Sequence, residues 1–108
     1  MASSRVRLSP SAQRDLAGII DRTVERFGSR QAKVYTTTLT KGLAALRAGP
    51  DLRDSVSREE FGRRLRSLHV AGQRRRGRHI IFYREAPDHS IEVVRILHDA
   101  MQFAQHLP

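Results

Sequence analysis

The sequence contains no cysteine. Disulfide bonds, thiolate nucleophiles and cysteine-ligated zinc are therefore excluded. Long hydrophobic runs are also missing, because no stretch approaches the roughly 18 to 20 apolar residues that a membrane-spanning helix needs. The opening residues, Met1 to Arg5, are not followed by the apolar core of a secretory signal. We therefore expect a cytosolic protein with no membrane partner.

Acidic residues are scarce relative to basic ones. The 108 residues include 11 Asp and Glu against 20 Lys and Arg, which gives a formal net charge of +9. The segment from Phe61 to Arg84 holds eight arginines and no acid. Arginine makes planar paired contacts with carboxylates and phosphates. A high arginine content also follows from a GC-rich genome, but this clustering favours a polyanionic partner, either nucleic acid or an acidic protein segment.

The first half of the chain predicts one strand and two helices. Residues 5–8 alternate polar and apolar side chains, as a short strand does. Ser9-Pro10 is a helix start, and apolar residues then recur at helical spacing until Gly28. A second helix is expected over 29–49. Two helices joined by about two residues form an antiparallel hairpin.

The second half predicts three strands and a short helix. Residues 51–62 are polar and predict a loop with at most one helical turn. Segments 64–70, 79–84 and 91–97 are rich in Ile, Val, Phe and Tyr and predict strands, whose short connections favour antiparallel pairing. Residues 99–107 predict a closing helix. The expected fold is a single α+β domain over residues 1–108, ordered β-α-α-β-β-β-α, with the helical hairpin packed on one face of an antiparallel sheet.

The last two predicted strands carry apolar side chains on both faces. Ile80 and Phe82 point to one side, while Ile81 and Tyr83 point to the other. The segment 91–97 is apolar on both sides as well, and we assign Ile91, Val93 and Leu97 to one face and Val94 and Ile96 to the other. A sheet covered on only one face should alternate apolar and polar residues. Either the C-terminal helix folds over the second face or a partner segment fills it.

The histidines and arginines leave several chemistries open. Among the five histidines, His69 and His79 could meet across neighbouring strands. Two ligands alone make a weak metal site. We therefore expect no metal or cofactor. Histidine with arginine can also cleave RNA by acid–base catalysis, although solvated histidines are the simpler interpretation. Candidates for that chemistry are Arg66, His69, His79, Arg95 and His98. The loop arginines Arg74, Arg75 and Arg76 either grip phosphates or form an exposed tip.

Four segments, in order, resemble a known family. They are Leu8 to Leu16, the Phe27-Gly28 junction with its following residues to Tyr35, the strand Arg78 to Arg84, and the closing segment that begins with Val93 to His98 and continues through Met101 to Leu107. Together they are similar to the ParE-type toxins of the RelE/ParE superfamily, from bacterial type II toxin–antitoxin systems. Gln102 and Gln105 depart from that pattern, because relatives commonly carry Asp and Arg there.

The resemblance implies a non-enzymatic toxin that inhibits DNA gyrase and is neutralised by an acidic cognate antitoxin. It also implies antitoxin contacts at Arg66, Arg78, Ile80, Phe82, Arg84, Val93 and Arg95. Target contacts are expected at Arg74, Arg75, Arg76, His98 and Met101. The alternative is a RelE-like, ribosome-dependent mRNA endoribonuclease that uses Arg66, Arg95 and His98. A plain basic nucleic-acid-binding domain is the third hypothesis.

Overall fold

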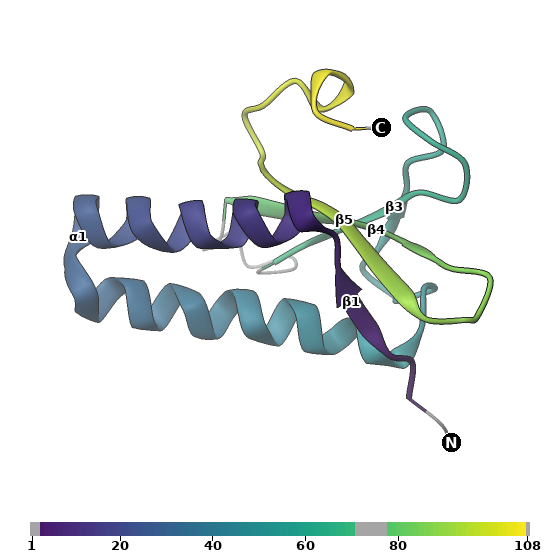
Figure 1. Ribbon diagram of the computed structural model, residues 1–108, viewed down its shortest axis with the longest axis horizontal. Coiled ribbons are helices and arrows are strands. Elements are labelled where there is room, and N and C mark those ends of the chain that lie inside the picture. Colours follow the sequence, from purple (N-terminus) through teal and green to yellow (C-terminus); the bar gives the residue numbers. More distant parts are fainter. Residues whose placement is uncertain (1–2, 71–77, 108) are drawn as a thin grey trace.

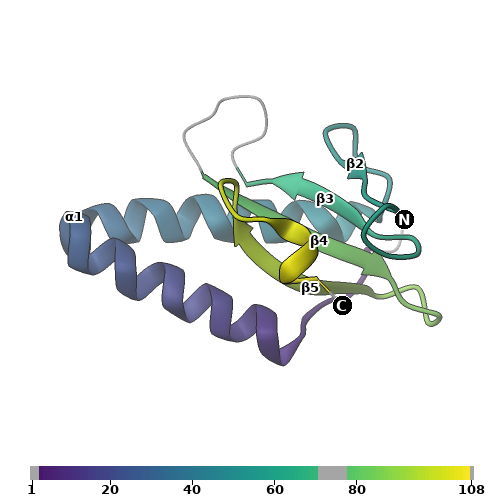
Figure 2. The same cartoon turned by 90° about the horizontal axis from the view of Figure 1, so that it is seen from above.

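The computed structural model describes residues 3–70 and 78–107. A long helical segment lies against one face of a five-stranded sheet, and the C-terminal segment lies against the other face (Figures 1 and 2). This arrangement has three layers and is of the α+β class. In chain order the elements are β1 (Val6–Leu8), α1 (Pro10–Ala45), η1 (Leu46–Ala48), β2 (Val56–Ser57), β3 (Arg66–His69), β4 (His79–Glu85), β5 (Ile91–His98) and η3 (Phe103–Gln105).

The sheet is mixed, so the prediction of a purely antiparallel sheet was wrong. The strand order is β1-β5-β4-β3-β2, and β1 runs parallel to β5 with Val6 opposite Ile91. β1 and β5 are not consecutive strands, because α1, β2, β3 and β4 lie between them in the sequence. The short strand β2 lies where the sequence predicted only a loop. β3 begins at Arg66 rather than at residue 64, because Arg64 has a left-handed φ of 61° that interrupts an extended strand.

One helical segment, α1, replaces the two separate helices that the sequence predicted. Its backbone leaves helical geometry at Gly28, where φ is 87° and ψ is 170°. Glycine adopts this conformation without the steric cost that a side chain would add. The two arms of α1 lie side by side and run in opposite directions from that point (Figures 1 and 2). The predicted start is confirmed, since the Ser9 hydroxyl accepts a 3.0 Å hydrogen bond from the Ala12 amide.

A register shift between Phe82 and Tyr83 decides which side chains of β5 face α1. Phe82 lies opposite Arg95 while Tyr83 lies opposite Val93, so Val94 is an extra residue in β5. As a result Val93 and Ile96 pack in the core beneath α1, whereas Val94 and Leu97 pack on the opposite face. The faces expected from the sequence were therefore wrong for Ile96 and Leu97: Ile96 shares its face with Val93, and Leu97 shares its face with Val94.

The predicted closing helix over residues 99–107 is reduced to the single turn η3. Asp99 does not cap a helix, because its carboxylate lies 3.7 Å from Arg78 Nε and 3.4 Å from His98 Nδ1. The main chain is held instead by a hydrogen bond of 2.9 Å from Arg95 Nη1 to the carbonyl of His106. These contacts hold residues 99–107 over the sheet, where they do not form an independent helix.

Candidate functional site

The chain's own C-terminal segment covers the second face of the sheet. Phe103 and Leu107, together with Phe61, pack on a buried cluster of Leu65, Ile80, Phe82, Val94 and Leu97. The Phe103 ring lies 4.9 Å from the Phe82 ring and 6.1 Å from the Phe61 ring, centroid to centroid. The first of the two alternatives left open by the sequence is therefore correct for this structure.

Three of the residues expected to contact an antitoxin are inside the protein. Ile80 is 8% exposed and Phe82 is fully buried, both beneath the C-terminal segment. Val93 is also fully buried, but it lies on the other face, beneath α1. A partner can reach Ile80 and Phe82 only if the C-terminal segment moves, and it cannot reach Val93 unless α1 separates from the sheet.

Arg95 is held in an internal ion pair. Its guanidinium donates two hydrogen bonds to the carboxylate of Asp15, of 2.7 and 2.8 Å, and a third to the main chain of the C-terminal segment. The same carboxylate accepts a 2.9 Å bond from the Ile96 amide. The hydrogen bonds to Asp15 raise the pKa of Arg95 above its ordinary value. Arg95 therefore joins α1, β5 and the C-terminal segment, and it has a structural role here.

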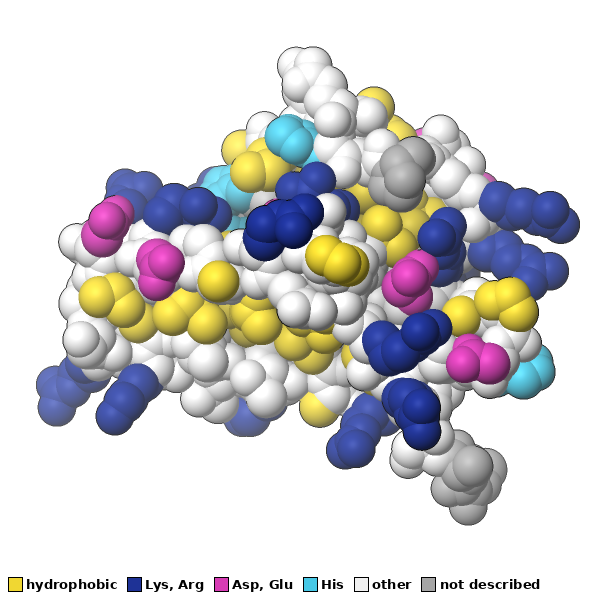
Figure 3. All heavy atoms as spheres, in the orientation of Figure 1, with side chains coloured by type: hydrophobic (Ala, Val, Ile, Leu, Met, Phe, Trp, Pro, Cys, Tyr) yellow, Lys and Arg dark blue, Asp and Glu magenta, His cyan; other side chains and the backbone are white. Residues whose placement is uncertain are grey.

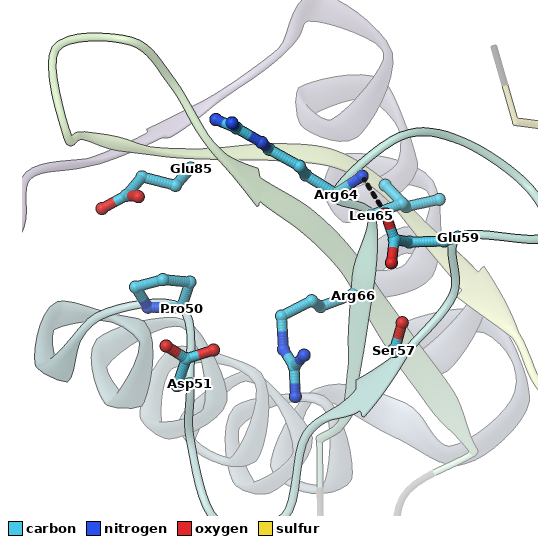
Figure 4. Close-up of a pocket in the computed structure, with 8 residues that line it drawn as sticks. All are labelled: Pro50, Asp51, Ser57, Glu59, Arg64, Leu65, Arg66 and Glu85. Carbon is cyan, nitrogen blue, oxygen red and sulfur yellow. Dashed lines mark hydrogen bonds between the residues drawn. The ribbon is translucent and has the colours of Figure 1, made fainter.

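Arg66 lies in a cleft of about 390 Å³ beside β2 and β3. Its Nε and Nη2 donate to the Ser55 hydroxyl at 3.1 and 2.8 Å. Figure 4 shows its guanidinium pointing between Asp51 and Ser57, with Arg64 extending from the same rim. Carboxylates of Asp51, Glu59 and Glu85 also line this cleft, so its charge is mixed.

Two further candidate arginines, Arg78 and Arg84, are accessible, and so is Met101. Arg78 has 69% of its side chain exposed, and Arg84 makes a 3.1 Å ion pair with Glu92 that leaves it 46% exposed. Met101 is 40% exposed on the C-terminal segment. Arg74, Arg75 and Arg76 lie outside the described residues.

The three residues of the RelE-like alternative, Arg66, Arg95 and His98, do not converge. Arg66 pairs with Tyr83 near one end of β4, whereas His98 pairs with His79 at the other end. Four residues of strand separate these positions by about 13 Å. Arg95 is bound to Asp15. No common reacting atom lies within hydrogen-bond reach of all three, so this arrangement does not form a catalytic triad.

An exposed apolar patch at the far end of α1 was missed by the sequence analysis. Val24, Phe27 and Val34 are 40%, 64% and 59% exposed. Figure 3 shows hydrophobic side chains in a row along α1. Phe27 continues the helical spacing of apolar residues in the first arm, but its side chain is exposed. The sequence did contain a sign of this exposure, because Phe27 directly precedes the turn at Gly28. Residues at the turn of a helical hairpin extend beyond the sheet and are not covered by it.

The structure also joins Tyr35 of α1 to His79 at the start of β4. The Tyr35 hydroxyl lies 2.6 Å from His79 Nδ1. Burial, then the nearby charges of His98 and Arg22, lower the pKa of His79 to about 4. Burial also raises the pKa of Tyr35. Both side chains are therefore neutral near pH 7.

The lowered pKa of His79 predicts a loss of stability in acid. The unfolded chain takes up this proton near pH 6.5, but the folded chain takes it up only near pH 4. The stability that neutral His79 contributes is complete above pH 6.5 and is lost progressively as pH falls from 6.5 through 4, a change of roughly 1 to 2 kcal/mol after allowance for solvent screening.

His79→Gln should remove this part of the slope of unfolding free energy between pH 4 and 6.5, as measured by urea denaturation. His89→Gln is the control, because His89 has 86% of its side chain exposed. Equal slopes in both variants and the parent chain would show that His79 does not cause the effect.

No helix in the described part of the chain is long and apolar enough to cross a membrane. Among residues 3–70 and 78–107, no three His, Cys, Asp or Glu side chains are grouped so that they could hold a metal ion.

The fold and the exposed residues define a class of protein: a small basic α+β domain with accessible arginines and exposed apolar residues beside the turn in α1. Comparison with known proteins identifies the family. The sequence model described as "ParE toxin of type II toxin-antitoxin system, parDE" matches residues 6–103. The chain therefore belongs to the ParE toxin family of type II toxin–antitoxin systems.

Individual relatives agree with this assignment. Two proteins named Toxin ParE1, from Mycobacterium tuberculosis strains CDC 1551 / Oshkosh and ATCC 25618 / H37Rv, are each 34% identical over 105 residues. The alignments cover 97% of this chain and 99% of each relative. A solved structure entitled "Chromosomal ParDE TA system from P. aeruginosa" has the same fold, with a TM-score of 0.70, 18% identity, and coverage of 89% of this chain and 96% of that one.

Proposed function

We propose that this toxin inhibits DNA gyrase by binding to it, without catalysing a reaction. Membership of the ParE family carries the proposal. The arrangement of the candidate catalytic residues supports it, because Arg95 is bound to Asp15 and His98 lies at the opposite end of β4 from Arg66. The accessible target contacts would be His98 and Met101, with the 74–76 arginines proposed as additional ones. Gyrase acts on DNA in the cytoplasm, where the toxin would meet it.

The partner that neutralises the toxin would be an acidic antitoxin. The net charge of +9 and the exposed Arg78 and Arg84 favour carboxylate contacts. Arg66 would add another, because its Nη1 has no hydrogen-bond partner among the residues that the structure describes. Contacts with Ile80 and Phe82 require displacement of Phe103 and Leu107, so we propose that the antitoxin competes with the C-terminal segment for this face.

A supercoiling assay tests the target. Purified toxin should prevent gyrase from supercoiling relaxed plasmid and should raise the amount of cleaved DNA. In a parallel translation extract, messenger RNA should remain intact. Normal supercoiling at saturating toxin would contradict the proposal, and cleaved messenger RNA in the extract would instead support the endoribonuclease alternative.

Charge removal tests the antitoxin contacts. Arg78→Ala and Arg84→Ala should each weaken antitoxin binding about tenfold, since a charge-assisted hydrogen bond contributes roughly 1.5 kcal/mol. Isothermal titration calorimetry would measure the change. Arg53→Ala removes an exposed arginine from the 51–55 loop and is the matched control. If Arg78→Ala and Arg84→Ala bind the antitoxin as tightly as the control Arg53→Ala does, then Arg78 and Arg84 do not contact the antitoxin.

A further inference from the structure

Two histidines of the sheet and one tyrosine of α1 lie close together at one end of the sheet, on the face that packs against α1. His79 begins β4 and His98 ends β5, and the two are directly paired in the sheet. Their rings meet edge to face, 5.3 Å apart at 88°. Tyr35, from the second arm of α1, reaches the same place, with its ring 5.6 Å from that of His79. Three elements that are distant in sequence thus converge there.

The hydrogen bonds determine which ring nitrogens carry protons. The Arg78 amide donates to the Tyr35 oxygen at 3.1 Å, and the Tyr35 hydroxyl proton is available to His79 Nδ1, 2.6 Å away. The Ala100 amide likewise donates to Nδ1 of His98 at 3.1 Å. Each neutral imidazole therefore carries its proton on Nε2. Neither Nε2–H has an acceptor among residues 3–70 and 78–107.

The charges around these rings are mostly positive. Arg22 comes from the first arm of α1, and Arg78 directly precedes β4. Asp99 is the carboxylate that acts on His79, and it already lies within 3.7 Å of Arg78 Nε. Burial and the charges of His98, Arg22 and His69 lower the pKa of His79, while Asp99 opposes them. An added negative charge would relieve this repulsion. In Figure 3, histidine side chains lie beside Lys or Arg side chains along the upper edge of α1.

We propose that Arg22, Tyr35, His79 and His98 form a binding site for a phosphate group, here called the His–Tyr site. The two unpaired Nε2–H donors come from β4 and β5, and Arg22 of the first arm of α1 adds a positive charge that acts on His79. A tetrahedral phosphate offers acceptors in several directions at once. Asp99 lies at the rim and weakens the attraction. The phosphate could belong to a DNA backbone or to a free phosphate compound. The inference does not depend on gyrase being the target.

Nuclear magnetic resonance of the histidine side chains tests the site, with pyrophosphate as the probe. Pyrophosphate should shift the His79 and His98 resonances, raise the pKa of His79 from about 4 by about one unit, and bind more tightly as pH falls. His98→Gln should weaken pyrophosphate binding about tenfold. Asp99→Asn should strengthen it, a change that loss of structure would not produce.

His89→Gln serves as the control, because His89 lies in the β4–β5 turn and is exposed. A short DNA duplex forms the second arm of the experiment. Weaker binding of both probes by His98→Gln assigns the site to DNA phosphates, and weaker binding of pyrophosphate alone assigns it to free phosphate compounds. Pyrophosphate shifts at His79 and His98 no larger than those at His89, or an unchanged affinity in both His98→Gln and Asp99→Asn, would overturn the proposal.

Discussion

Asp15→Ala is expected to destabilise the protein by about 3 kcal/mol, because it leaves the Arg95 guanidinium and the Ile96 amide without their partner. The side chains of Asp15 and Arg95 are only 14% and 24% exposed, so water cannot fully replace the lost bonds. Urea denaturation monitored by circular dichroism would measure the difference. In a domain of this size, that loss is a large fraction of the total free energy of unfolding.

The matched control is Asp21→Ala. Asp21 lies in the same arm of α1 but is exposed, so its replacement changes the charge and the helix propensity equally without breaking this ion pair. We expect a change within about 0.5 kcal/mol for the control. Similar losses from both substitutions would mean that the Asp15–Arg95 contact contributes little to stability.

Phe82→Ala is expected to cost about 4 kcal/mol, the largest single effect on stability that we predict, because it empties a fully buried aromatic site. Phe103→Ala should cost less, since Phe103 is only partly buried. The two rings are 4.9 Å apart, so the double variant should cost about 1 kcal/mol less than the sum of the single ones.

This double-mutant cycle separates packing of the C-terminal segment from general loss of the core. Phe82→Ala with Leu39→Ala is the control pair, because Leu39 lies in the other core cluster, beneath α1. Its two effects should be additive. A coupling energy near zero between Phe82 and Phe103 would show that the C-terminal segment does not cover this face in solution. Variants that are too unstable for urea can be replaced by Phe82→Leu, with a smaller expected loss.

Local pattern was enough to predict the elements that depend on neighbouring residues. The Ser9 cap and the strands near 79–84 and 91–97 are present, because capping and β-forming side chains act within a few residues. The parallel pairing of β1, the short β2 and the register shift at Phe82 depend on contacts across the sheet. Periodicity carries no information about such contacts.

The functional residues were harder to predict for the same reason. Arg95 has the sequence character of an exposed binding residue, but its partner Asp15 is eighty positions away and only the fold brings them together. Ile80 and Phe82 were correctly predicted to need a cover, while the sequence left open whether the cover belonged to this chain. Arg78 and Arg84 are accessible, as an antitoxin contact requires.

We propose that this ParE-family toxin acts on gyrase by stoichiometric binding. The most direct measurement is gyrase supercoiling at a fixed gyrase concentration while the toxin concentration is increased. We expect inhibition to develop as toxin approaches the concentration of gyrase and to be reversed by the cognate antitoxin. If toxin at a small fraction of the gyrase concentration inhibits supercoiling completely, and the inhibition progresses with time, the toxin acts as a catalyst. Full supercoiling with toxin in excess would show that gyrase is not the target.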